Sequence, residues 1–183
     1  MYIKKAMQTY ARQGGSSSIF VHDDGLQLLN EADRQERIRF YADQGIGWVA
    51  RPKHDSSPGG FKRAGRFKKA SNMNYGLALS LKMEEHIRKL ELERGEKNSV
   101  TDSTVSDDAN DDLEEQALRM AIEDTFEESG RQHRPWAHNA RALRVGEIIL
   151  IVDADTVVPE VRRFDFFVTP NCVVDFSTTG LFP

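Results

Sequence analysis

The chain has 183 residues, a net charge of −4, a hydrophobic content of 39% and a mean hydropathy of −0.56. This length suits one domain with additional polar segments, and the negative charge argues against a general nucleic-acid binder. The single cysteine, Cys172, excludes an internal disulfide. No apolar run reaches the roughly 20 residues that span a bilayer, so we expect a soluble protein from the sequence as written.

The first 45 residues predict two helices on either side of a strand. Residues 3–13 lack glycine and proline, which favours a helix. The stretch SIFVHDDG, residues 18–25, predicts a short strand that ends in two aspartates. Asn30 is a candidate cap for a second helix, which is expected to stop at Gly45.

A second strand and a long helix are predicted next. IGWVAR, residues 46–51, predicts the strand, and residues 53–67 predict a loop because they are rich in Gly, Pro and Ser. The segment from Arg51 to Lys69 contains seven basic residues and a single acid, Asp55. We expect the long helix to begin near Ala70 or Ser71. Its apolar stripe should be formed by Met73, Leu77 and Leu81 and continued by Ile87 and Leu90 after a change of face.

The remainder predicts an acidic insertion followed by a third strand. Residues 94–110 are polar and without periodicity, so we expect them to be flexible. A helix over 112–128 is expected to pack loosely. EIILIV, residues 147–152, predicts a strand buried on both faces. Because strands alternate with helices, the predicted class is α/β with parallel strands.

Charged residues lie where the predicted strands end. Asp23 and Asp24 close the first strand, Lys69 follows the second, and Asp153 and Asp155 close the third. Ligands of parallel α/β sheets bind beyond the carboxyl ends of the strands. Asp153 and Asp155, two positions apart, are suited to one Mg²⁺ or Mn²⁺ ion, Lys69 at a helix start is suited to a phosphate, and Asp23 or Asp24 to a base or ribose.

Each of these signals also has a purely structural interpretation. An acid-x-acid tripeptide is a weak marker of a metal site, the DDG sequence is a common turn, and basic loops are usually only solvated. Their coincidence at three strand ends favours a site for a nucleotide diphosphate.

Three segments follow one another along the chain: IFVHDDG, RFKKASNMNYGLAL and GEIILIVDADTVVPE. In sequence and in order they resemble the family 2 glycosyltransferases, which include cellulose and chitin synthases. The second segment has Ser71 where the family usually has glycine. The resemblance implies a partial, Rossmann-like GT-A fold that binds a nucleotide-sugar, here a UDP-sugar, through Mn²⁺ or Mg²⁺. It implies substrate contacts and metal ligands at the following positions: Asp23, Asp24, Lys69, Asn72, Asn74 and Asp153 for the substrate, and Asp153 and Asp155 for the metal.

The resemblance covers roughly residues 18–160, less an insertion at about 95–140, and residues 161–183 match nothing in the family. We expect residues 1–160 to form the partial nucleotide-sugar-binding domain. The earlier strand and the acceptor-binding half, which carries the catalytic base in the family, are missing. We therefore expect an incomplete fragment that binds the donor without transferring sugar to a carbohydrate acceptor, and the catalytic residues stay unknown.

The acidic helix supports a second interpretation. EEQALRMAIEDTFEE resembles a ubiquitin-interacting motif, in which acids are followed by Leu118 and by Ala121 on a small apolar patch, with Thr125 where serine is usual. In that case residues 112–128 form a protein-interaction module for ubiquitin. An ordinary amphipathic helix explains the same pattern.

Overall fold

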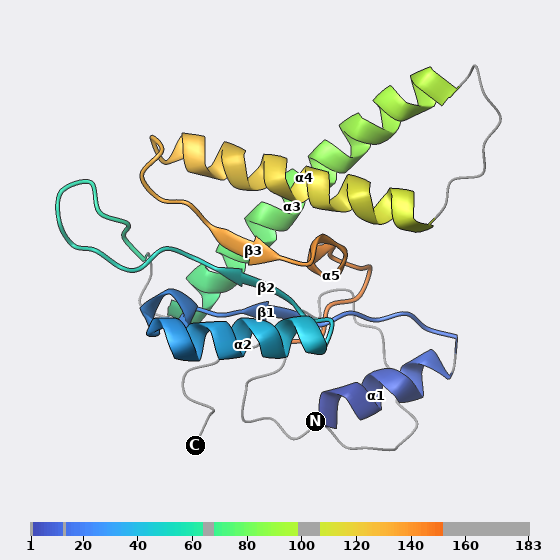
Figure 1. Ribbon diagram of the computed structural model, residues 1–183, viewed down its shortest axis with the longest axis horizontal. Coiled ribbons are helices and arrows are strands. Elements are labelled where there is room, and N and C mark those ends of the chain that lie inside the picture. Colours follow the sequence, from blue (N-terminus) through green and yellow to red (C-terminus); the bar gives the residue numbers. More distant parts are fainter. Residues whose placement is uncertain (1, 13, 64–67, 99–106, 152–183) are drawn as a thin grey trace.

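The computed structural model describes residues 2–12, 14–63, 68–98 and 107–151 (Figure 1). Within them lie the following elements, in chain order: α1 (Tyr2–Ala11), β1 (Phe20–His22), the 3-10 helix η1 (Leu26–Leu28), α2 (Glu31–Asp43), β2 (Gly47–Ala50), α3 (Lys68–Asn98), α4 (Asp107–Glu128), β3 (Trp136–His138) and α5 (Ala140–Leu143). None of the helices in this part of the chain is long and apolar enough to cross a membrane.

The protein is a mixed α/β structure around a three-stranded sheet of order β1-β2-β3. β1 and β2 are parallel, with Val21 opposite Trp48, which confirms the α/β class and the pairing predicted for the first two strands. β3 is antiparallel to β2, with Val49 opposite Ala137. It lies inside the segment that the sequence predicted to be an insertion.

The strand predicted over residues 147–152 is wrong for the part that the structure describes, because Glu147 to Ile151 forms no strand. Its aliphatic side chains are largely exposed: Ile148 by 57%, Leu150 by 42% and Ile151 by 39%. β2 already has hydrogen-bonded neighbours on both sides, β1 and β3. An aliphatic run becomes a strand only where a neighbouring strand pairs with it, so its composition alone was not sufficient.

Helices cover both faces of the sheet, and α2 lies on one of them (Figure 1). Because strand side chains alternate between faces, Ile19, Val21, Trp48 and Ala50 form one core with α2 through Tyr41. The predicted cap of α2 is confirmed, since the Asn30 side chain accepts a hydrogen bond from the Asp33 amide. Its predicted stop at Gly45 is also confirmed, where φ is +63°.

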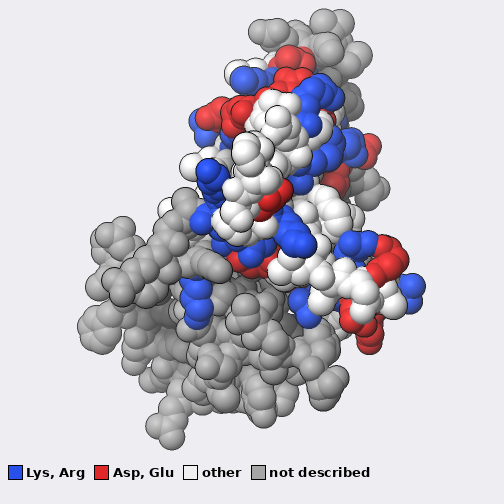
Figure 2. All heavy atoms as spheres, turned by 90° about the vertical axis from the view of Figure 1, so that its left-hand side faces the viewer, with Lys and Arg blue, Asp and Glu red and all other residues white. Residues whose placement is uncertain are grey.

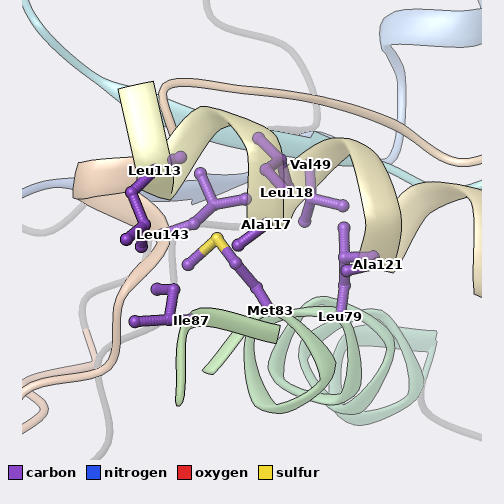
Figure 3. Close-up of a cluster of buried hydrophobic side chains, with 10 residues drawn as sticks. Val49, Leu79, Met83, Ile87, Leu113, Ala117, Leu118, Ala121 and Leu143 are labelled. Carbon is purple, nitrogen blue, oxygen red and sulfur yellow. The ribbon is translucent and has the colours of Figure 1, made fainter. Parts of the chain in front are cut away.

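The opposite face of the sheet is covered by α3 and α4, which cross in Figure 1. Their shared core also takes Val49 from β2 and Leu143 from α5 (Figure 3). The expectation of a loosely packed helix is wrong, because α4 buries the following four side chains almost completely: Leu113, Ala117, Leu118 and Ala121. Flexibility was predicted over 94–110, but α3 continues to Asn98 and α4 begins at Asp107; residues 99–106 lie outside the described part.

The first half of the long helix packs through a different face from the one predicted, whereas the second half is confirmed, because Ile87 is buried and Leu90 packs against the same core. Leu81 is 63% exposed. Among the α3 side chains whose burial is described, the buried positions are Asn72, Gly76, Leu79, Ser80, Met83, His86 and Ile87. The prediction followed the largest apolar side chains, but this face includes small and polar residues where the helix meets the sheet. A Cβ atom on Gly76 would lie 2.3 Å from the Cε1 atom of His22 and 2.8 Å from Cγ1 of Val49.

Substitution of Gly76 tests this close approach. We expect Gly76→Ala to lower the free energy of unfolding by about 2 kcal/mol or more, because α3 must move away from β1 and β2. Gly95→Ala is the matched control in the same helix, since its Cβ meets nothing within 4 Å; it should stabilise the protein by roughly 0.5–1 kcal/mol. Urea unfolding of both variants measures the difference, and equal changes would contradict the packing described here.

Candidate functional site

Asp23 is a buried residue that closes β1. Its amide continues the ladder by donating to the carbonyl oxygen of Val49 at 2.9 Å. Its carboxylate accepts hydrogen bonds from the Tyr41 hydroxyl at 2.8 Å, the Arg37 guanidinium at 3.2 Å and the amide of Gly25 at 3.1 Å. The side chain is completely buried. Asp23 therefore joins β1 to α2 and fixes the turn that follows.

Asp24 has the opposite orientation and holds two arginines. Arg51 donates to its two carboxylate oxygens at 2.5 and 2.9 Å. Arg63 donates to the carboxylate at 3.1 Å and to the backbone carbonyl oxygen of Asp24 at 2.9 Å. The Asp24 side chain retains 18% exposure, while that of Arg51 retains 1%. This ion cluster lies at the carboxyl ends of the parallel strands.

The start of α3 completes this edge. Ser71, which departs from the family pattern, accepts a hydrogen bond from Arg51 at 2.8 Å. Asn72 is buried and donates from its side chain to the carbonyl oxygen of His22 at 3.0 Å. These contacts attach the first turns of α3 to the ends of both β1 and β2.

The structure brings together Asp23, Asp24 and Asn72 from the residues that the sequence singled out. Lys69 lies in the first turn of α3 and is exposed, as is Asn74. Asp153 and Asp155, the predicted metal ligands, lie outside the described residues. Among the residues that are described, no group of three or more His, Cys, Asp or Glu side chains is placed to hold a metal ion.

Several buried polar atoms around the edge have no hydrogen-bond partner in the described part of the chain: Nε of Arg63, Oδ1 of Asn72, the hydroxyl of Tyr75 and Nδ1 of His22. Such atoms are rare in folded proteins because each loses its bonds to water. Burial lowers the pKa of the Arg63 guanidinium; attraction to Asp24 opposes this shift and repulsion from Arg51 adds to it. Burial raises the pKa of Tyr75, and nearby Arg51 partly offsets that shift. The carboxyl edge of the sheet is thus polar, and some of its buried donors and acceptors have no hydrogen-bond partner among the described residues.

A hollow of about 560 Å³ lies along the loop that follows β2. It is lined by six residues of the loop and one beyond α4: Pro52, Lys53, His54, Asp55, Ser56, Phe61 and His133. Figure 2 views the molecule from the side of this loop, and the described Lys and Arg side chains there are interspersed with Asp and Glu. Recognition of an anion on that face therefore depends on individual side chains rather than on a broad positive field.

Arg51 and Arg63 were not singled out by the sequence. They are two of seven basic residues in one loop-forming segment, and its composition does not indicate which of them turn inward. The position of Arg51 could have been inferred, because alternate residues of a strand share a face and Arg51 follows Gly47 and Val49 on the face toward α3. Asp24 points to the same face. Arg63 lies in a loop, where the sequence has no periodicity from which the direction of a side chain could be inferred.

The predicted ubiquitin-interacting helix is α4, and its apolar patch is already occupied. Ala121 is fully buried and Leu118 is 2% exposed, both in the core shared with α3. Thr125 accepts from Lys82 of α3 at 3.2 Å. A ubiquitin-like partner would therefore have to displace α3 before it could reach this patch.

His22 generates a prediction for stability against pH. Burial lowers its pKa from 6.5 to about 4, and a hydrogen bond with the Asn72 backbone partly opposes the shift. The unfolded chain therefore takes up this proton below pH 6.5 while the folded chain resists it until about pH 4, so stability falls as the pH drops through this interval. Between pH 7 and 5 this should remove about 2 kcal/mol from the free energy of unfolding.

We expect His22→Gln to lose this share of the pH dependence, while His138→Gln, which removes an exposed histidine from β3, keeps it. Urea unfolding at pH 7, 6 and 5 makes the comparison. Parallel stability curves for wild type and His22→Gln would mean that His22 is not held neutral by the fold.

No family model, no curated protein and no solved structure matches the chain at a significant level. The carboxyl edge of β1 and β2 must therefore be interpreted from its own residues. They are a carboxylate held by two arginines, a buried asparagine and a partly buried tyrosine from α3, and the adjoining hollow.

Proposed function

We propose that the protein binds a nucleotide-sugar, most simply a UDP-sugar, at the carboxyl edge of β1 and β2, in the manner of the family 2 glycosyltransferases that its sequence resembles. The observation that carries the proposal is the sharing of the Asp24 carboxylate by Arg51 and Arg63 at this edge. Parallel α/β sheets bind ligands in this position. A Rossmann-like GT-A arrangement of the sheet is part of the same proposal.

The state of Arg63 supports an anionic ligand. Its side chain is 9% exposed and lies close enough to Arg51 for repulsion to contribute to lowering its pKa. Its Nε has no hydrogen-bond partner among the described residues. A phosphate next to Arg63 would reduce this repulsion and accept the unused hydrogen bond. Arginine suits this role because its planar donors match two phosphate oxygens at once.

The two aspartates have different parts in this proposal. The hydrogen bonds of Asp23 are directed to Tyr41, Arg37 and the following turn, so Asp23 holds the edge in place. Asp24 is partly exposed and meets the ribose or base directly. Asn72 and Asn74 lie on the first turns of α3, and Lys69 at the helix start adds a positive charge for the diphosphate, where exposed amides also favour anions.

The divalent ion belongs to the same proposal. Asp153 and Asp155 would hold Mg²⁺ or Mn²⁺, which prefers carboxylate and phosphate oxygens. When bound, the ion neutralises charge on the diphosphate. Donor binding is therefore expected to depend on both the metal and the arginines.

Arg63 provides the sharpest test of the anion site. We expect Arg63→Ala to weaken UDP binding about tenfold, because a charge-assisted contact to phosphate is lost. Folding should be retained, since Arg51 still neutralises Asp24. Lys62→Ala is the matched control: it removes the same charge from the neighbouring exposed position and should change the affinity less than twofold. Calorimetry with UDP in the presence of Mn²⁺ measures the affinity of both variants. An equal loss of affinity in the two would mean that Arg63 acts only through its charge and not through a specific contact.

The metal part is tested separately with Asp155→Ala. We expect wild-type protein to bind UDP at least tenfold more tightly with Mn²⁺ than without it, and Asp155→Ala to lose this difference. Asp43→Ala, which removes an exposed acid from α2, should preserve it. Equal affinity with and without metal in the wild type would eliminate Asp153 and Asp155 as the metal site.

A further inference from the structure

The loop between β2 and α3 is attached to the chain segment that follows α4. The ring of His133 lies 2.9 Å from the carbonyl oxygen of Gly59 through Nε2. Because a carbonyl oxygen only accepts, His133 must be the donor and carry a proton on Nε2. The same ring meets Phe61 edge-on, with centroids 5.5 Å apart. His133 therefore contacts two positions of the loop that precede Arg63.

Hydrogen bonds within the loop connect the segment that His133 contacts to Arg63. The amide of Asp55 donates to the carbonyl oxygen of Phe61 at 2.9 Å, and the amide of Gly60 donates to that of Ser57 at 3.0 Å. The amide of Arg63 donates to Nδ1 of His54 at 3.2 Å. These bonds make the loop a stiff connection, so a shift at Gly59 or Phe61 is transmitted to Arg63.

Two glycines allow the loop to fold this tightly. Gly59 has a φ of +82°, which L side chains rarely adopt, and a Cβ on Gly60 would lie 2.5 Å from the carbonyl oxygen of Asp55. Phe61 also meets the ring of Tyr75 from α3, with centroids 5.9 Å apart. Phe61 therefore contacts both His133 and α3, two residues before Arg63.

We propose that His133 is a positioning residue for Arg63: by fixing Gly59 and Phe61, it holds the Arg63 guanidinium on Asp24 at the edge where the anionic ligand binds. This inference rests on the proposed function for the identity of the ligand. It assigns the segment after α4 a part in the binding site although His133 itself lies at the hollow and not at the ion cluster. Loss of His133 allows Arg63 to leave the edge without disturbing the hydrophobic core.

A double-mutant cycle with UDP as the probe tests the coupling. We expect His133→Ala to weaken UDP binding about fivefold in the wild-type background and less than about 1.5-fold in the Arg63→Ala background, because residues that act through one another are not additive. His133→Gln keeps a donor for Gly59 and should recover most of the affinity. His138→Ala, an exposed histidine on β3, is the control and should leave binding unchanged.

A second measurement follows Arg63 without any ligand. Trypsin must extract the Arg63 side chain, which is 9% exposed, whereas the neighbouring Lys62 is exposed. We expect His133→Ala to raise cleavage after Arg63 relative to cleavage after Lys62 at least threefold by mass spectrometry, with no change in His138→Ala. Circular dichroism of each variant establishes that the fold is retained.

The outcomes separate the inference from the function on which it rests. If wild-type protein binds UDP and the effect of His133→Ala is the same in both backgrounds, the positioning role is overturned and the proposed function stands. If wild-type protein does not bind UDP, the proposed function fails, and the protease ratio decides whether His133 positions Arg63; an unchanged ratio overturns that role as well.

Discussion

The edge of the sheet depends on the ion pair between Arg51 and Asp24. Arg51 is almost fully buried, and a buried charge without its partner destabilises a protein by about 3–5 kcal/mol. Asp24 therefore has to stay beside Arg51, and Ser71 accepts a hydrogen bond from Nη1 of Arg51. One interaction thus joins the ends of β1 and β2 to the start of α3, and the loop that carries Arg63 closes on the same carboxylate.

Much of the layered architecture could be predicted from local patterns, because those patterns have a direct physical cause. Asn30 caps α2 and Gly45 ends it as the sequence indicated. The packing face of the first half of α3 could not be predicted in the same way, since it is defined by Gly76, where any side chain would meet His22. Hydrophobic periodicity finds the faces that bury large side chains, and it misses a face where a small residue allows two backbones to approach.

The sequence allowed the position of the candidate site to be predicted, but not all of the residues that form it. The acids at the end of β1 follow from the strand ending in Asp23 and Asp24, and their opposite orientations follow from the alternation of side chains. The partners of these two acids come from distant segments. Arg37 and Tyr41 belong to α2, Arg51 directly follows β2, and Arg63 lies in the loop between β2 and α3. The strand predicted after residue 146 shows the same limit, because a strand needs a partner that composition does not specify.

The two adjacent aspartates face different layers of the structure, and the proposed function assigns a structural role to Asp23 and a binding role to Asp24. Asp23 is enclosed by α2, and its contacts are with a helix that is capped and packed in the core. Asp24 retains 18% exposure, and one of its two arginines, Arg63, comes from a loop rather than from a packed helix. In the proposed function, an anion therefore competes for arginine only on the Asp24 side, while Asp23 keeps the end of β1 fixed. A strand that ends in two acids then serves two needs: one carboxylate maintains the edge, and the other leaves Arg63 able to exchange partners.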